Sequence, residues 1–296
     1  MTSKVNIIAV GGGKGGIGKS VVCTNLAIGM ALSGQKVVLI DTDFGASNLH
    51  ALLGINNPAH GFQDFFNENF PNKQSLLIDT GIGNLKFVSG AGDNPGSANI
   101  DADKINTVIS FIKNLEADTI LLDLGPGTNF NVIDFFNISI QSVVLTTPEI
   151  TSVMKTFSFI RSVLFRRISL AFQGNPEIQK LVDHSNPGNA DIETYTTDLL
   201  RERFTKDFPD HLDQLNTIVK SFKPGLVVNR VRSKKDLLTG DNLLKLVKKF
   251  LKLEATYLGY IVESDQVRDS VDEMVPFLIK DPQSTPSENL QQIISS

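Results

Sequence analysis

Short runs of apolar residues alternate along the chain with longer segments in which apolar and polar positions follow a helical spacing. Alternation of this kind is typical of βαβ units, in which parallel strands form a sheet that helices cover on both faces. The sequence therefore predicts an α/β fold with a doubly wound, mostly parallel sheet. The expected strands are residues 5–10, 37–40, 85–88, 119–122, 142–145, 225–228 and 257–262.

One stretch departs from this alternation. Residues 165–223 stand where a short connection between a helix and a strand is expected, since such connections usually have about 2 to 6 residues. Helix-like patterns fill the stretch, so we expect residues 1–296 to form a single domain with a helical insertion at 165–223. Two interpretations stay open: helices that pack on the domain and cover apolar surface, or a surface that binds an adaptor protein.

A second segment, residues 243–253, has the pattern of a basic amphipathic helix. In isolation such a helix can lie on a membrane surface. It stands between two expected strands, however, where its apolar stripe is needed against the sheet. We therefore expect this helix to pack into the domain.

The composition is that of an ordinary globular protein, with 41% hydrophobic and 20% charged residues and a net charge of −4. The negative charge argues against a nucleic-acid partner. Two basic groups flank the expected insertion, and they are candidates either for binding DNA phosphates or anionic lipid, or for a solvated face. They are Arg161, Arg166 and Arg167 before it, and Arg230, Arg232, Lys234 and Lys235 after it.

The chain has a single cysteine, Cys23, which we expect to pack inside a helix as a small apolar residue. One cysteine cannot form a disulfide within the chain, and the four histidines show no metal-ligand spacing. Every apolar run is strand-sized, and no signal peptide is recognised. These features favour a cytoplasmic protein without a metal cluster.

The most specific motif lies between the first expected strand and a helix-like segment at 21–32. Residues 13–20 fit the phosphate-loop pattern G-x-x-x-x-G-K-[ST], with a second lysine, Lys14, five residues before Lys19. Glycines let successive backbone N–H groups point at phosphate oxygens, and the helix N-terminus adds its positive end. Lys19 is expected at the β/γ-phosphates, and the Ser20 hydroxyl at Mg²⁺. The expected nucleotide-binding residues are Gly13, Lys14, Gly15, Gly16, Ile17, Gly18, Lys19, Ser20 and Val21.

Carboxylates follow two of the other expected strands. Asp41 and Asp43 come directly after strand 37–40, and Asp123 comes directly after strand 119–122. Because the carboxyl ends of parallel strands form the ligand edge of an open α/β sheet, these side chains are expected near the phosphate loop. Asp123 is interpreted as the Walker B acid, which holds Mg²⁺ directly or through water. The alternative for each aspartate is a turn or cap residue.

Four segments together resemble the MinD/ParA family of deviant Walker A ATPases, and within it most closely MinD and the flagellar-number regulator FlhG. The loop KGGIGKS at 14–20 resembles the family's phosphate loop, and DTDFGASN at 41–48 resembles its switch I. The segment DLGPGT at 123–128 resembles its switch II, and TPEITS at 147–152 resembles a strand-to-helix segment of the family.

The resemblance implies roles for single residues. It places Lys14 across a dimer interface on the partner's phosphates, Asp43 at the attacking water, and Asp41 near the shell of Mg²⁺. It implies that Asn229 contacts adenine, which favours ATP, with Arg230 beside it in the nucleotide site. Asn48 and Gly127 fall in the two switches.

The resemblance also implies a function. The chain is expected to be a slow, partner-stimulated ATP hydrolase that forms a homodimer with ATP and Mg²⁺ and positions a flagellum, a division site or a polar machine. Its partners would be a second copy and an activating or adaptor protein. It would be cytoplasmic, with recruitment to a pole, a membrane or the nucleoid, although residues 290–294 lack the basic side chains of the C-terminal amphipathic helix of MinD.

Two alternatives remain. One is a DNA-partitioning ATPase whose ATP dimer binds DNA nonspecifically, and the other is a non-hydrolysing, nucleotide-gated protein-binding module. Salt-dependent DNA binding would select the first. Absence of ATP turnover, even with partners, would select the second.

Overall fold

A computed structural model of the chain describes residues 5–45, 47–67, 70, 72–90, 101–184 and 196–296. Its centre is an eight-stranded sheet with the strand order β3-β4-β2-β5-β1-β6-β7-β8. All neighbouring strands pair in parallel except β3 and β4, which are antiparallel. The strands are β1 Asn6–Gly11, β2 Val37–Asp41, β3 Ile78–Asp79, β4 Leu85–Val88, β5 Thr119–Asp123, β6 Gln141–Thr146, β7 Gly225–Val231 and β8 Thr256–Val262.

The expected doubly wound, mostly parallel sheet is confirmed, and each of the seven expected strands is present within a few residues of its expected ends. The sequence pattern missed β3, the one antiparallel strand. Its two residues are too short a run to show the period-2 alternation from which strands are recognised.

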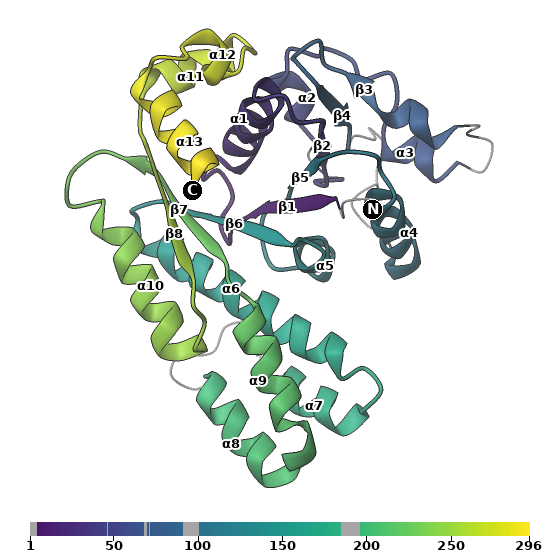
Figure 1. The fold of residues 1–296 in the computed structure, drawn as a ribbon, viewed down its shortest axis with the longest axis vertical. Coiled ribbons are helices and arrows are strands. Elements are labelled where there is room, and N and C mark those ends of the chain that lie inside the picture. Colours follow the sequence, from purple (N-terminus) through teal and green to yellow (C-terminus); the bar gives the residue numbers. More distant parts are fainter. Residues whose placement is uncertain (1–4, 46, 68–69, 71, 91–100, 185–195) are drawn as a thin grey trace.

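Helices cover both faces of this sheet (Figure 1). One face packs on α1, α12 and α13, whose buried residues form one hydrophobic cluster with Val10, Leu39 and Val227 of the strands. The other face packs on α4, α5, α6 and α10 through Ala9, Ile40 and other strand residues. The helices are α1 Lys19–Leu32, α2 Leu49–Leu52, α3 Phe62–Phe65, α4 Ala102–Lys113, α5 Phe130–Asn137, α6 Ile150–Ala171, α7 Pro176–His184, α8 Thr197–Asp207, α9 Leu212–Ser221, α10 Leu238–Leu251, α11 Asp265–Asp272, α12 Phe277–Lys280 and α13 Thr285–Ser295, with the 3₁₀ helices η1 Lys73–Leu76 and η3 Pro209–His211.

The segment between β6 and β7 forms a helical lobe, which we define as the second half of α6 together with α7, α8, α9 and η3 (Figure 1). The expected boundary at Phe165 falls inside α6, a single helix of 22 residues. Residues 185–195 of the expected insertion lie outside the described residues. Buried apolar residues of the lobe join the same hydrophobic cluster as one face of the sheet; they are Ile178, Val182, Leu200, Phe204, Leu215, Val219 and Phe222.

The first basic group from the sequence is engaged inside the protein. Arg161 is only 2% exposed. Arg166 makes two hydrogen bonds of 2.8 Å to the carboxylate of Asp134. Arg167 donates to Asn137 and lies 4.3 Å from the ring centroid of Phe222. Because Arg161 is buried and the guanidinium groups of Arg166 and Arg167 are bound within the fold, these three arginines do not form a free basic surface for DNA or lipid.

The two amphipathic segments singled out in the sequence both pack into the domain. Helix α10 buries Leu243, Val247 and Leu251, as expected for residues 243–253. Helix α13 buries Leu290 and Ile293 against the cluster that contains α1. Cys23 is fully buried, also as expected. Among the described residues, no helix is long and apolar enough to cross a membrane.

Candidate functional site

The glycine loop after β1 is closely packed, and two of its glycines have no room for a side chain. A Cβ at Gly13 would lie 2.0 Å from the carbonyl oxygen of Lys155 in α6. A Cβ at Gly18 would lie 2.4 Å from Nδ2 of Asn229, and Gly18 has φ +90°, a left-handed conformation. Since L side chains rarely adopt such a conformation, glycine is required there. The loop then enters α1, which begins at Lys19.

Lys19 is buried within electrostatic range of carboxylates that end or follow the central strands. It is 7% exposed. Burial lowers the pKa of its ammonium group, while the charges of Asp123 and Asp43 raise it. The structure therefore brings Lys19, Asp43 and Asp123 together, as the sequence predicted.

Asp41 and Asp123 are buried side by side, because β2 and β5 pair in parallel with these residues in register. Burial raises the pKa of Asp41 to about 6, although hydrogen bonds from Ser47 and from the backbone N–H groups of Asp43 and Leu49 oppose the shift. Burial and the charge of Asp41 raise the pKa of Asp123 to about 8, against a hydrogen bond from Ser20. Oδ1 of Asp123 is buried and has no hydrogen-bond partner.

The segments expected to be switches lie beside these carboxylates. The carboxyl group of Asp43 faces Gly125, where a Cβ would lie 3.2 Å from Cγ of Asp43. Gly127 has φ +93°, which suits glycine. Asn48 is exposed and is the residue before α2. Asp43 and these two residues thus come from loops that follow β2 and β5, as expected from the sequence.

The second lysine has different surroundings. Nζ of Lys14 lies 3.4 Å from the Thr151 hydroxyl at the start of α6. Nearby, the Thr147 hydroxyl donates to Glu149, and this bond, with the charges of Lys14 and Arg232, lowers the pKa of Glu149. Lys14 therefore contacts a neutral hydroxyl and lies within electrostatic range of the exposed Glu149, whereas Lys19 is buried within electrostatic range of Asp43 and Asp123.

A cavity of about 390 Å³ adjoins the end of the glycine loop. Its walls come from the start of α1, from the ends of β7 and β8, and from α11 and α12, and they include Gly18, Val21, Asn229 and Arg230. Asn229 is 8% exposed and donates from Nδ2 to the carbonyl oxygen of Ile17, at 2.8 Å. The structure thus places Asn229 and Arg230 beside the loop, as expected.

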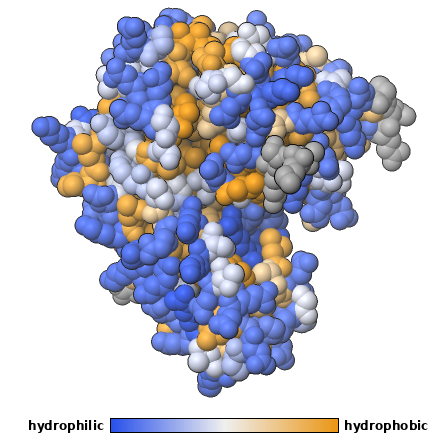
Figure 2. Space-filling view, viewed as in Figure 1, coloured by the Kyte–Doolittle hydropathy of each residue, from blue (hydrophilic) through white to orange (hydrophobic). Residues whose placement is uncertain are grey.

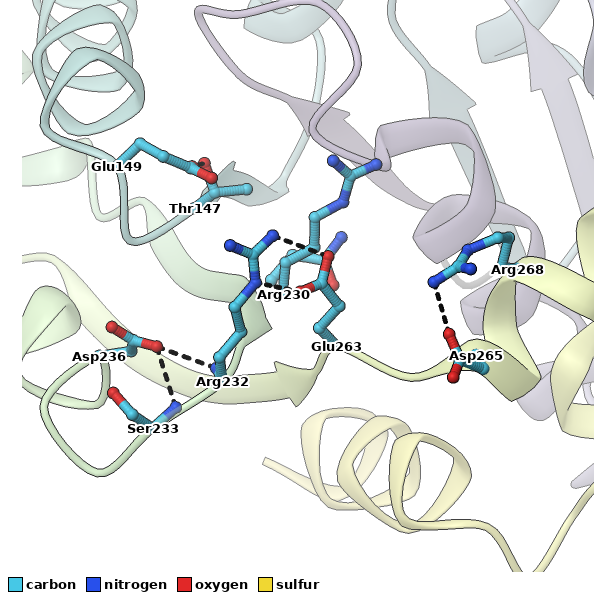
Figure 3. A network of polar contacts seen from close by, with 10 residues as sticks. Thr147, Glu149, Arg230, Arg232, Ser233, Asp236, Glu263, Asp265 and Arg268 are labelled. Carbon is cyan, nitrogen blue, oxygen red and sulfur yellow. Dashed lines mark hydrogen bonds and ion pairs between the residues drawn. The ribbon is translucent and has the colours of Figure 1, made fainter.

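Charged residues at the rim of this cavity were not singled out in the sequence as members of the site. Glu263 lines the cavity and forms an ion pair with Arg232, whose Nη2 lies 2.9 Å from Oε1 of Glu263. Figure 3 shows Arg232 between Glu263 and the segment that carries Thr147 and Glu149. Arg268 also lines the cavity and pairs with Asp265. The sequence did contain a signal for these residues, because Arg232 and Glu263 each stand shortly after one of two expected strands.

The family model described as "CobQ/CobB/MinD/ParA nucleotide binding domain" matches residues 8–277. The chain belongs to this family. The MinD/ParA resemblance inferred from the four sequence segments is therefore confirmed.

Relatives within the MinD/ParA family match part of the chain. The septum site-determining protein MinD of Helicobacter pylori is 33% identical over 147 residues, which are 49% of this chain and 54% of that protein. The antiactivator FleN of Pseudomonas aeruginosa is 28% identical over 159 residues, which are 53% of this chain and 56% of that protein. The chain thus spans about half the length of the curated relatives it matches.

Solved structures of MinD/ParA proteins match nearly the whole chain. Septum site-determining protein MinD from Pyrococcus horikoshii, complexed with Mg-ADP, has a TM-score of 0.65 and 18% identity, covering 98% of this chain and 94% of that one. A ParA family ATPase from Chlorobium tepidum has a TM-score of 0.64 and 15% identity, covering 99% of each chain. At this identity the likeness shows the MinD/ParA fold.

Proposed function

We propose that this MinD/ParA family member is an ATP-dependent dimerising switch that hydrolyses ATP slowly. The contrast between its two loop lysines carries the proposal. Lys19 is buried within electrostatic range of Asp43 and Asp123, at the start of α1, where it would neutralise the phosphates bound in its own subunit. Lys14 lies at the surface, 3.4 Å from a neutral hydroxyl. A second copy that docks on this edge gives Lys14 a strong charge partner in the form of its triphosphate.

The buried acids fit a magnesium site. The unpartnered Oδ1 of Asp123 is an oxygen ligand without a donor, and the Ser20 hydroxyl hydrogen-bonds to the same carboxylate. Asp41 lies beside Asp123 and would hold a water of the metal shell. Among the described residues, no group of three or more His, Cys, Asp and Glu side chains could hold a metal. Mg²⁺ bound with a nucleotide usually needs only one or two protein ligands, because phosphates and water supply the others.

The cavity of about 390 Å³ would hold the nucleoside. It opens beside Gly18 and Val21, so a nucleotide with its phosphates in the loop places its base and ribose there. Asn229 and Arg230 lie on the wall nearest the loop, where they would contact the nucleoside and favour ATP.

Hydrolysis would depend on Asp43. Its carboxyl group lies against Gly125 and within electrostatic range of Lys19, at the end of the loop where the terminal phosphate would lie. There it would position the attacking water, which is the main contribution a protein makes to phosphoryl transfer. Turnover would be slow without a partner that completes this arrangement.

The cellular role would be to position a flagellum, a division site or a polar machine through an activating or adaptor protein. The names of the H. pylori MinD and the P. aeruginosa FleN support a role of this class. The helical lobe is the proposed adaptor surface; in Figure 2 hydrophilic residues cover most of it, with small hydrophobic areas between them. A cytoplasmic protein recruited to a pole, a membrane or the nucleoid would suit this role. The DNA-partitioning alternative is less favoured, because Arg161 is buried and Arg166 and Arg167 are bound to other side chains of the fold.

The proposal is tested by measuring molar mass by light scattering with Mg-ATP, Mg-ADP and Mg-GTP, together with phosphate release. A dimer with Mg-ATP alone and slow phosphate release are expected. A monomer under all three conditions would contradict the dimerising switch. ATP-dependent DNA binding that weakens with salt would select the partitioning function. An ATP dimer without any phosphate release, even with a partner, would select the non-hydrolysing module.

A further inference from the structure

The side-chain amide of Asn229 is hydrogen-bonded to backbone on both of its sides. Its Nδ2 donates to the carbonyl oxygen of Ile17 at 2.8 Å, and its Oδ1 accepts from the N–H of Arg230 at 3.0 Å. The first bond joins residues 212 positions apart in the chain. A side chain held at both ends, at 8% exposure, has one orientation only.

The local backbone of β7 produces this orientation. The pairing of β7 with β8 shifts register between Val228 and Val231, so Asn229 and Arg230 stand in an irregularity of the ladder. Arg230 takes a left-handed conformation with φ 59°, which is unusual for a residue with a side chain. Such strain persists only where the surroundings hold it, and it clusters at functional sites.

The other end of the contact is the last turn of the phosphate loop. Ile17 and Gly18 directly precede Lys19 and Ser20, the two residues that start α1. A Cβ at Gly18 would lie 2.4 Å from Nδ2 of Asn229, so the amide packs against this turn as well as bonding to it. Gly18 has φ +90°, a conformation that glycine permits. Because glycine has no side chain, contacts from neighbouring residues must hold that conformation in place.

We propose that Asn229 is a positioning residue for the phosphate loop: its amide holds the Ile17–Gly18 turn in the conformation that directs the loop N–H groups and Lys19 at the phosphates. The inference rests on the proposed nucleotide-binding function and deepens it. Contact with the nucleoside would use the remainder of the amide, since backbone already engages one of the two Nδ2 hydrogens and one of the two Oδ1 lone pairs.

A ligand without a nucleoside separates the two roles of Asn229. Binding of Mg-tripolyphosphate and of Mg-ATP is measured by isothermal titration calorimetry. Asn229→Ala removes both bonds, and Asn229→Asp keeps the acceptor for Arg230 but loses the donor to Ile17. Asn229→Ala is expected to weaken the binding of tripolyphosphate and of ATP by the same factor, about tenfold, the size expected for one buried hydrogen bond. Asn229→Asp is expected to weaken both at least as much, because its carboxylate also repels the phosphates.

Asn114→Ala is the matched control. Asn114 also donates from Nδ2 to a backbone carbonyl, that of Ser110 at 2.8 Å, but at the end of α4. This variant is expected to bind both ligands as the wild type does. Thermal unfolding of each variant checks that it is folded, and Asn229→Asp, which keeps the size of the side chain, serves if Asn229→Ala does not fold.

Three results would overturn the inference. In the first, the variants bind ATP more weakly but bind tripolyphosphate as the wild type does, which makes Asn229 a nucleoside contact. In the second, the variants bind both ligands as tightly as the wild type does. In the third, Asn229→Asp binds tripolyphosphate as the wild type does, which makes the donor to Ile17 irrelevant. Lys19→Ala separates these results from failure of the proposed function: if the wild type and Lys19→Ala bind tripolyphosphate equally, the loop is not a phosphate site at all.

Discussion

Asp41 and Asp123 lie opposite each other in register at the carboxyl ends of β2 and β5. Burial raises the pKa of Asp41 to about 6, and burial together with the charge of Asp41 raises the pKa of Asp123 to about 8. The strand pairing therefore creates a pair of carboxyl groups that is costly to ionise without a cation. This cost makes the nucleotide-free site sensitive to pH.

The contribution of Asp123 to the stability of the nucleotide-free protein should fall as pH rises from about 4 to about 8. The folded state keeps a proton on Asp123 up to a pKa of about 8, whereas the ordinary value is 3.8. Within this window the folded state binds more protons than the unfolded state, so its stability decreases with pH. Asp123→Asn should therefore be more stable than the wild type at pH 9, by a few kcal/mol as an order of magnitude, with a much smaller difference at pH 4.

Urea unfolding of both proteins without nucleotide or Mg²⁺ at the two pH values measures this difference. Asp210→Asn, at an exposed aspartate, is the control and should leave stability unchanged at both. A gap between Asp123→Asn and wild type that does not grow with pH would show that Asp123 is already ionised at pH 4.

Lys19→Ala and Lys14→Ala should have different effects. Lys19→Ala should weaken ATP binding about a hundredfold, because a charge-assisted contact to phosphate contributes about 1.5–3 kcal/mol. Lys14→Ala should bind ATP as a monomer and fail to dimerise, because Lys14 lies at the surface beside Thr151. Titration with labelled ATP and light scattering measure the two effects. Wild-type dimerisation of Lys14→Ala would rule out its cross-subunit role.

Asp43→Ala should bind ATP, form the dimer and remain dimeric. The substitution removes the proposed water-positioning carboxylate and leaves the loop, Lys19 and Asp123 in place. The dimer lifetime after dilution and the rate of phosphate release measure the effect, and the release rate should fall about a hundredfold or more, since a positioned acid–base group contributes about 10²–10⁴-fold. Phosphate release at the wild-type rate would mean that another group positions the water.

The helical lobe should be required for stability. Phe204 is fully buried in α8, so Phe204→Ala should cost about 3–5 kcal/mol of unfolding free energy. Leu199→Ala in the same helix, where Leu199 is 41% exposed, should cost far less. Excision of residues 174–216 should yield aggregated protein, because it uncovers Phe165, Ile168 and Phe172 of the shared cluster. Soluble, ATP-binding protein after excision would show that the lobe is an independent addition.

Substitutions at exposed positions of the lobe test whether it binds an adaptor, without unfolding the lobe. Leu199→Glu and Arg203→Glu change side chains at the surface of α8. Together they should abolish recruitment in cells while ATP-driven dimerisation continues. Normal localisation of the folded double variant would show that this surface of α8 does not bind the adaptor.

The strands and the glycine loop could be predicted because their signals are local. Each buried parallel strand is a continuous apolar run, and the loop pattern fixes glycine, lysine and serine at set distances. The proximity of Asp41 and Asp123 could also be predicted from the sequence, since parallel strands bring their carboxyl ends to one edge of the sheet. The sequence did not reveal why Gly13 must be glycine, since the reason is the backbone of Lys155 in a distant helix.

The rest depended on tertiary contacts. Three arginines close together in the sequence suggested a basic surface, but Arg166 and Arg167 face α5 and Arg161 faces the interior. The bonding of Asn229 depends on a register shift and on the left-handed conformation of Arg230, neither of which has a residue signature here. The ion pair between Arg232 and Glu263 joins residues 31 positions apart, each directly after one of two adjacent strands.

Helix α6 touches the phosphate loop at Lys155 and carries the lobe at its other end. Its 22 residues form one uninterrupted helix, about 33 Å long at about 1.5 Å per residue. A tilt of this helix by about 5° about its nucleotide end would displace the far end by about 3 Å. A change of bound nucleotide that moves the Gly13 contact by a fraction of an ångström would be amplified at the lobe, without any bending of the helix between them.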